Sequence, residues 1–268
     1  MVRLPAVAGY FYPRKPQELR SMIQGMVDTR AQKEKALAVV SPHAGFVYSG
    51  AVAGAVYSAV VLPKVFIILG PSHRGQRSIF GLMNEGIWKT PLGEVPLDSE
   101  LAASLLRRSS LIRVDAEAHE EEHSLEVQLP FIQFLNPEFS LVPICVSPMA
   151  DYAALEELGK SLAASVRDCG REVLIVASTD MSHYVSQEQA RRKDFLAIER
   201  MLALDARGLF EIVREEDISM CGFQPATASI LAAKELGARR ADLIRYSNSG
   251  EVSGDFDQVV GYAGLRFV

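Results

Sequence analysis

Short, continuous apolar runs alternate with amphipathic segments along this chain. Residues 36–40 and 64–69 are two such runs, the pattern of strands buried on both faces of a sheet. The Ala- and Val-rich segment 50–62 between them predicts a helix, which makes a β-α-β unit. The same patterns predict helices at 16–28, 98–107, 151–166, 187–204, 209–215 and 226–236, and strands at 139–146, 172–177, 241–246 and 259–267.

Strands that alternate with helices, without a repeat or a low-complexity linker, predict an α/β fold. We expect one three-layer domain over residues 1–268, with helices on both sides of a mainly parallel or mixed sheet. Two segments fit this scheme less simply. Residues 79–96 contain several Gly and Pro residues and Trp88, and favour a hairpin or an irregular flap, whereas 124–129 favours a helix that bends or ends near Pro130.

Composition narrows the class of protein. The formal charge is −5 and basic residues occur only in short clusters, so we expect no nucleic-acid partner. No apolar run is long enough to cross a bilayer, and the first residues lack the order of a signal peptide, which predicts no membrane partner. The 3 cysteines are too few for a disulfide framework. These features together predict a cytoplasmic protein.

Three of the strand-like runs are followed by histidines. The first two are followed by His43 and His73, and the third by Asp180 and His183. In an open α/β sheet, ligands bind outside the carboxyl ends of the strands, so we expect these side chains to lie around one cleft. Neutral imidazoles bind divalent transition metals, and the pattern therefore predicts a metal site.

We assign His43 and His73 as the first two ligands of this site. Cys221 is the third, because it lies in a turn before a helix, where the helix dipole would favour its thiolate. Asp180 and His183 are then neighbours that orient a ligand or move a proton. The alternatives are structural: the histidines bond loop carbonyls, Cys221 is an inert buried thiol and Asp180 caps a turn.

The segment His119-Glu120-Glu121-Glu122-His123 fits the H-E-x-x-H pattern of zinc metallopeptidases. The match is weak, because no third ligand is evident and no apolar stripe would bury such a helix. The acidic run 117–122 is more simply a solvated face. Cys145 fits the core of a strand and Cys169 the end of a helix, so neither is placed in the site.

Five spaced motifs, together with the segment 8–12, resemble the Memo family over nearly the whole chain. They are Pro42-His43-Ala44-Gly45, Leu69-Gly70-Pro71-Ser72-His73, Glu122-His123-Ser124-Leu125-Glu126, Ser178-Thr179-Asp180-Met181-Ser182-His183 and Cys221-Gly222. Memo proteins are similar in fold to class III extradiol ring-cleaving dioxygenases. The resemblance implies that His43, His73 and Cys221 bind the metal and that Asp180 and His183 line the same pocket.

The resemblance also implies a mechanism, in which His183 acts as base and then acid toward a substrate hydroxyl while Asp180 holds its imidazole. Tyr48 is expected to line the mouth of the pocket, or to be a core aromatic. His123 is expected to contact substrate, or to pair with Glu126 behind the site or on the surface. The related dioxygenases bind iron(II) through two histidines and a carboxylate, and the thiolate here widens the metals from Fe(II) to Zn and Cu.

The leading hypothesis is a metal-dependent oxidoreductase, similar to extradiol dioxygenases, that acts on a small phenolic or chelating substrate. The first alternative is a non-catalytic metal-binding or peptide-binding adaptor on the same scaffold, and the second is a zinc metallopeptidase. Expected partners are therefore a small molecule or a short peptide. The resemblance to microbial Memo-like genes also implies a pathway link to a radical-SAM enzyme.

Overall fold

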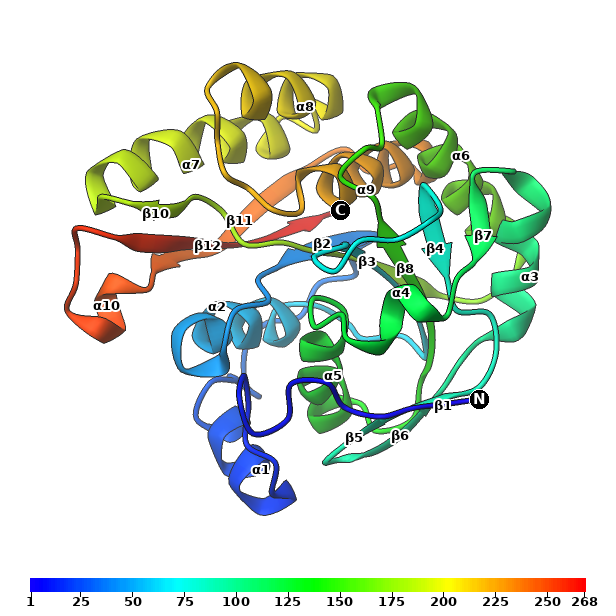
Figure 1. Ribbon diagram of the computed structural model, residues 1–268, viewed down its shortest axis with the longest axis horizontal. Helices are drawn as coiled ribbons and strands as arrows, with labels where there is room; N and C mark the ends of the chain where they lie inside the picture. The colour runs from blue at the N-terminus through cyan, green and yellow to red at the C-terminus, as the bar shows by residue number, and fades with distance from the viewer.

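The computed structural model of the protein describes residues 1–268 and shows a nine-stranded sheet between two layers of helices (Figure 1). Its central strands lie in the order β2-β9-β3-β8 and are parallel, whereas β12 is antiparallel to β2 and β4 to β8. The sheet is therefore mixed. Its strands are β2 (Ala38–Ser41), β3 (Val65–Pro71), β4 (Phe80–Leu82), β7 (Ile112–Val114), β8 (Ser140–Val146), β9 (Val173–Ser178), β10 (His183–Val185), β11 (Ala241–Asn248) and β12 (Val259–Phe267).

Helices cover both faces of this sheet. The upper layer in Figure 1 consists of α3 (Ser99–Arg108), α6 (Tyr152–Asp168), α7 (Gln187–Leu202), α8 (Ala206–Glu215) and α9 (Phe223–Leu236). The lower layer consists of α1 (Pro16–Gln24), α2 (Phe46–Ser58), α5 (Leu129–Leu135) and a small sheet of β1 (Val2–Arg3), β5 (Ile87–Thr90) and β6 (Gly93–Pro96). The remaining short elements are α4 (Glu117–Glu120), the 3₁₀ helix η1 (Glu126–Gln128) and α10 (Gly250–Ser253).

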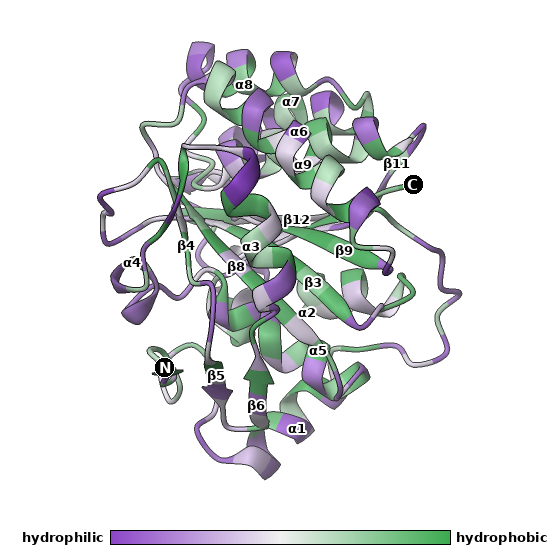
Figure 2. Ribbon diagram, turned by 90° about the vertical axis from the view of Figure 1, so that its right-hand side faces the viewer, coloured by the Kyte–Doolittle hydropathy of each residue, from purple (hydrophilic) through white to green (hydrophobic).

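Alternate residues of the central strands enter the two layers. In β3, Ile67 and Leu69 pack into the upper core, whereas Phe66 and Ile68 pack into the lower one. All seven residues of β3 are buried, which is why this strand reads as a continuous apolar run. Figure 2 shows the same contrast, with hydrophobic strands at the centre and hydrophilic stretches on the surrounding helices. The predicted three-layer α/β domain is confirmed.

The predicted helices and strands exist, with shifted ends. The segment 50–62 forms its helix earlier, over Phe46–Ser58. The Asp98 carboxylate caps α3 by accepting a hydrogen bond from the Leu101 N–H at 3.0 Å. The segment 79–96 forms three short strands, and Trp88 is fully buried among the side chains of the lower core. The possible flap is therefore a packed part of the fold.

The helix expected to bend or end near Pro130 instead begins close to it. Residues Glu126–Gln128 form a 3₁₀ turn that continues into α5, whose second residue is Pro130. Proline lacks the backbone N–H that a helix interior needs, but the first turn does not use that donor, so the proline is accommodated there. The helical segment therefore continues through Pro130 and does not end there.

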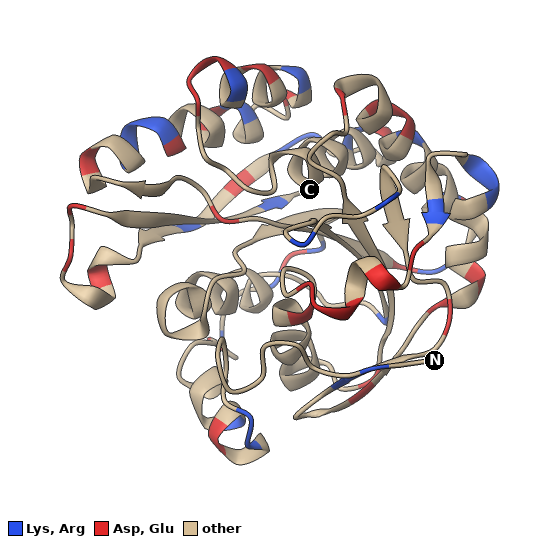
Figure 3. Ribbon diagram, viewed as in Figure 1, with Lys and Arg blue, Asp and Glu red and all other residues tan.

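Charged residues lie mainly on the outer elements. Acidic and basic residues are interspersed along α7 and α8, and the central strands carry few of either sign (Figure 3). No helix of the structure combines the length and the apolar character that a bilayer span requires. Cys145 is buried in β8 and Cys169 follows the last turn of α6, as the sequence predicted.

Candidate metal centre

Three adjacent parallel strands place the predicted residues at one edge of the sheet. Strand β9 lies between β2 and β3, and Ser41 of β2 is in register with Ser178 of β9. His43 follows the end of β2, His73 follows the end of β3 and Asp180 follows the end of β9. The convergence expected from the sequence is therefore present, because the carboxyl ends of these strands meet at one edge.

A third imidazole joins this edge from another part of the chain. His123 lies between α4 and η1, and the candidate ligand atoms of His43, His73 and His123 all lie within 4.8 Å of one another. The ring centroids of His73 and His123 are 4.6 Å apart. We call this the three-histidine cluster. Such a group is compatible with metal binding, and imidazole is a ligand for zinc, copper and iron.

A glycine in β3 lets the His123 segment approach the sheet. A Cβ atom on Gly70 would lie 2.5 Å from the Ser124 hydroxyl oxygen and 2.8 Å from a Leu125 methyl carbon. Any larger residue would push the segment away from the strand. The Ser124 hydroxyl in turn donates to the Pro71 carbonyl at 3.1 Å, which attaches the segment beside His73.

The ring of His43 is held in one tautomer by its neighbours. The Ser178 hydroxyl donates its only proton to the Ser124 carbonyl at 2.6 Å and accepts a bond from the Gln128 amide at 2.8 Å. Nδ1 of His43 lies 3.0 Å from the same hydroxyl oxygen and must therefore be the donor. The lone pair of His43 is thus on Nε2, which is the state a metal ligand needs.

Glu122 orients His73 in a similar way. The Glu122 carboxylate accepts from Nδ1 of His73 at 2.9 Å and from the His73 backbone N–H at 2.6 Å. It is fully buried, and burial raises its pKa, but the bonds from His73 and from the Ser124 N–H outweigh this and lower the pKa to about 2. An ionised carboxylate only accepts, so Nδ1 of His73 is the donor and Nε2 is the ring atom left to bind a metal.

Burial keeps two of the three imidazoles neutral. It lowers the pKa of His43 far below its usual value, and the nearby His123 and His73 add to the effect. Burial likewise lowers the pKa of His123 to about 4, although the Glu122 charge opposes it. Both rings therefore present lone pairs at neutral pH without losing a proton first.

Cys221 lies beside the cluster, with Sγ 3.2 Å from Nε2 of His43 and 3.3 Å from the Asp180 backbone nitrogen. A Cβ atom on the next residue, Gly222, would lie 2.5 Å from the Ser178 carbonyl, so only glycine lets this turn approach β9. Burial and the Asp180 charge raise the pKa of the Cys221 thiol. These two effects outweigh the lowering of the thiol pKa that was expected from the helix dipole. The thiol therefore stays protonated until a bound cation offsets the effect of burial.

Asp180 and His183 both border the cluster, but they do not bond each other as expected. The Asp180 carboxylate accepts from the backbone N–H of His43 at 2.8 Å, and burial raises its pKa to about 6 against the effect of that bond. Nδ1 of His183 donates a hydrogen bond to the Ser219 carbonyl at 2.8 Å. The Ser219 carbonyl, and not Asp180, therefore orients His183 and leaves Nε2 as its basic atom.

The cluster opens into a pocket of about 270 Å³. Phe11 forms one wall, with its ring centroid 4.8 Å from that of His123. Tyr184 lies at the rim, is 73% exposed and adopts a φ of +56°, which is rare outside glycine. Ala44, Gly45 and Val260 also line the pocket.

Tyr48 does not line the pocket, although the sequence placed it at the mouth. It is on the first turn of α2 and is 43% exposed, so it is not a core aromatic either.

The H-E-x-x-H segment does not form the helix that a metallopeptidase needs. Helix α4 ends at Glu120, so His119 and His123 do not share a helical face. Nε2 of His119 lies 3.0 Å from the Gly81 carbonyl, and Nδ1 lies 3.4 Å from Sγ of Cys145.

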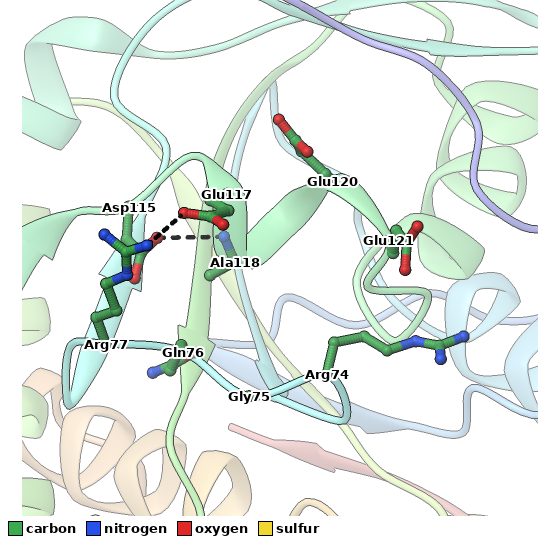
Figure 4. A pocket seen from close by; sticks show the side chains of 9 residues that line it. All are labelled: Arg74, Gly75, Gln76, Arg77, Asp115, Glu117, Ala118, Glu120 and Glu121. Carbon is green, nitrogen blue, oxygen red and sulfur yellow. Dashed lines mark hydrogen bonds and ion pairs between the residues drawn. The ribbon is translucent and has the colours of Figure 1, made fainter.

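Glu120, the glutamate of the pattern, borders a separate cavity of about 440 Å³. This cavity lies between α4 and the loop 74–77, where Arg77 pairs with Glu117 (Figure 4).

Glu122 and His123 lie in positions that were not expected from the sequence. The run 117–122 was predicted to be a solvated acidic face, but the Glu122 side chain is fully buried. His123 was expected to contact substrate, whereas the structure groups it with His43 and His73. Glu126, expected to pair with His123, is buried against Arg3 and Tyr12 instead. The motif 122–126 was the available signal, since it combines a histidine and two acids directly before a buried apolar run.

Comparisons with known proteins identify the family of the chain and its fold. The family described as Memo-like protein matches residues 3–266. A MEMO1 family protein of Methanopyrus kandleri is 42% identical over 100% of this chain and 99% of its own length, and one of Methanothermobacter thermautotrophicus is 40% identical over 99% and 100%. An uncharacterized protein from Escherichia coli K12 is similar in fold, with a TM-score of 0.60 at 13% identity over 87% of this chain and 100% of its own. Because the family match and these relatives span almost the entire sequence, the chain belongs to the Memo family.

Proposed function

We propose that this protein is a metal-dependent oxidoreductase that acts on a small phenolic or otherwise chelating substrate, in the manner of class III extradiol dioxygenases. Fe(II) is the metal we favour, with Zn or Cu as the other candidates. The observation that carries the proposal is a pair of oriented imidazoles: the hydrogen bonds at Nδ1 of His43 and at Nδ1 of His73 leave Nε2 of each ring as the atom that can bind a metal at the mouth of one pocket. A site of this kind is ready to bind a divalent cation.

The third protein ligand is either His123 or Cys221. His123 completes a three-imidazole set that suits Fe(II) and Zn, and its ligand atom already lies within 4.8 Å of the other two. Cys221 is a softer donor that would favour Zn or Cu(I), and its sulfur lies against His43. The chemistry of the set fits the metal in both cases, because each leaves positions open for a substrate.

When bound, iron would supply activation of oxygen and polarisation of the substrate's hydroxyl groups. The remaining steps belong to this chain. His183 lines the pocket and, with Nδ1 bonded to the Ser219 carbonyl, offers Nε2 to remove a proton from a hydroxyl and to return it later. Phe11 supplies an apolar wall against which a flat ring can pack. Asp180 fixes the backbone of His43 and Ala44.

Oxygen uptake with a panel of catechols after anaerobic loading with Fe(II) tests the proposal. We expect substrate-dependent consumption that His183→Ala abolishes while metal content stays at the wild-type level. Tyr10 is an exposed residue outside the pocket lining, so Tyr10→Phe is the control and should leave oxygen consumption and metal content unchanged. Metal-loaded protein that consumes no oxygen with any of the compounds would instead support the alternative, a metal-binding or peptide-binding protein.

Variants at the two candidate third ligands identify the set. If His123 is the ligand, His123→Ala loses metal and Cys221→Ser retains it, and the reverse pattern assigns the thiolate. Retention of full stoichiometry in both variants, and in His43→Ala and His73→Ala, would refute the centre as a whole.

The cytoplasmic location and the link to a radical-SAM enzyme remain part of this proposal. The location is supported by the three free cysteines.

A further inference from the structure

The guanidinium group of Arg3 is buried against the segment that carries His123. Its side chain is 3% exposed and lies on β1, far from His123 in the sequence. Nε donates to the His119 carbonyl at 2.9 Å, one terminal nitrogen donates to the Glu122 carbonyl at 2.6 Å, and the other pairs with the Glu126 carboxylate. The group also lies over the Trp88 ring, 4.3 Å from its centroid.

One of these contacts is to the peptide that joins Glu122 to His123. That single peptide carries on one side the carboxylate that orients His73, and on the other side an imidazole of the three-histidine cluster. Fixing its carbonyl therefore fixes two of the three rings at once. We infer that Arg3 is a positioning residue for the metal centre: it holds His123 through the peptide that joins Glu122 to His123, and His73 through the Glu122 carboxylate. This inference rests on the proposed metal centre.

The segment that carries His123 is not held in place by a helix or a strand of its own. Helix α4 has four residues and ends at Glu120, and the 3₁₀ turn η1 begins only at Glu126. Residues 121–125 between them belong to no helix or strand. Arg3 bonds a carbonyl before this stretch, one within it and a side chain after it, so it spans the whole gap. A guanidinium fork suits this task, because its donors point in fixed and different directions.

The remaining partners of Glu126 explain how Arg3 itself is held. The Glu126 carboxylate accepts from the backbone N–H groups of Ala6 and Val7 at 2.8 and 3.2 Å, and from the Tyr12 hydroxyl. Strand β1 pairs with β5 through only two residues, Val2 and Arg3. The buried ion pair therefore attaches β1 to the segment that carries His123. Removing only one partner would leave a buried charge and destabilise the fold, so the test must separate positioning from stability.

The experiment compares Glu126→Gln with the double variant Arg3→Met/Glu126→Gln. Glu126→Gln leaves the buried Arg3 cation with a neutral amide oxygen in place of the carboxylate, and the double variant removes both charges. Only the double variant frees the His119 and Glu122 carbonyls, and the unfolding midpoints of both variants are measured so that a loss of stability is not taken for a loss of positioning. We expect the double variant to bind Zn(II) at least about tenfold more weakly than Glu126→Gln in competition with a chromophoric chelator, the effect of losing a group that orients a metal ligand. Arg3→Lys keeps a charge without the fork and should not restore the affinity.

Arg266→Met is the matched control. Arg266 is a largely buried arginine of β12 that also bonds a carbonyl, that of Ala59, and two carboxylates, those of Glu34 and Asp242. None of these residues lines the metal pocket. With unfolding midpoints of the metal-free proteins measured in parallel, Arg266→Met should be destabilised without losing Zn(II) affinity. An equal loss of affinity in Arg266→Met, or equal affinities of Glu126→Gln and the double variant, overturns the inference.

Hydrogen exchange keeps this result separate from the proposed function. In the metal-free protein, amide exchange over residues 119–128 should be at least about tenfold faster in the double variant than in Glu126→Gln, because the segment opens locally. Unchanged exchange there would overturn the role of Arg3 even if the wild-type protein failed to bind Zn(II) or Fe(II). A wild-type protein that binds neither metal refutes the proposed centre alone.

Discussion

Two buried histidines of this protein each lie against a cysteine, yet only one pair belongs to a candidate metal site. Nε2 of His43 is 3.2 Å from Sγ of Cys221, and Nδ1 of His119 is 3.4 Å from Sγ of Cys145. Burial lowers the pKa of both imidazoles and raises that of both thiols. The residue types are thus the same in the two pairs, and burial shifts the pKa values in the same directions.

The pairs differ in what surrounds the lone pair. Nε2 of His43 faces a pocket that it shares with His73, His123 and His183. The ring of His119 is fully buried, with one nitrogen bonded to the Gly81 carbonyl and the other against the Cys145 thiol. The difference shows that a histidine beside a cysteine becomes a metal site only where further ligands converge and a position stays open.

The largest expected effect separates the two histidines directly. Each of His43→Ala and His73→Ala should lower the affinity for Fe(II) or Zn(II) by at least about 100-fold, because a ligand is lost together with its orienting bond. His119→Gln should keep the wild-type stoichiometry. Metal analysis of dialysed protein checks both, and loss of metal from the His119 variant would contradict the comparison.

A smaller effect is expected from the carboxylate that orients His73. Glu122→Gln should weaken metal binding by about 10- to 100-fold, since the amide no longer secures the tautomer of His73 with Nε2 free. Glu121→Gln changes a neighbouring residue that borders the separate cavity, and should alter the affinity by less than about twofold. Chelator competition at pH 7 measures both. Equal affinities of the two variants would remove Glu122 from the site.

His119 should instead appear in the pH dependence of stability. Its pKa of about 4 in the folded protein lies below the 6.5 of an unfolded chain, because burial penalises the charged ring. The unfolded state therefore binds more protons between these values, so stability should fall as the pH falls from 6.5 to 4, by up to about 3 kcal/mol. Urea unfolding of metal-free protein should show a shallower pH slope for His119→Gln than for the wild type, and identical slopes would contradict this.

The smallest effect concerns the two thiols. Cys145→Ala should cost about 1 kcal/mol of stability through the space it leaves in the core, with metal binding unchanged. Cys221 lies at the rim of the centre, so Cys221→Ala should lower the free energy of unfolding by less than Cys145→Ala does. Urea midpoints compared with metal affinities of the two variants check the difference. A change of metal affinity in Cys145→Ala would show that the two pairs are coupled.

The local elements could be predicted because their signals are local. The buried run that became β3 and the capping Asp98 of α3 depend on neighbours in the sequence, and both predictions hold. The order of the strands explains why His43, His73 and Asp180 could also be placed together. Parallel strands end at one edge, so residues that follow them meet without any knowledge of side-chain packing.

The sequence alone therefore determined the α/β architecture and the edge of the sheet at which the histidines gather. Only the tertiary structure decided that His123 completes the cluster, that Glu122 is buried behind His73, and that Arg3 spans the segment between them. These three depend on contacts between residues far apart in the chain. An acidic residue that follows a short helix is interpreted as solvated unless one knows which N–H groups lie against its carboxylate.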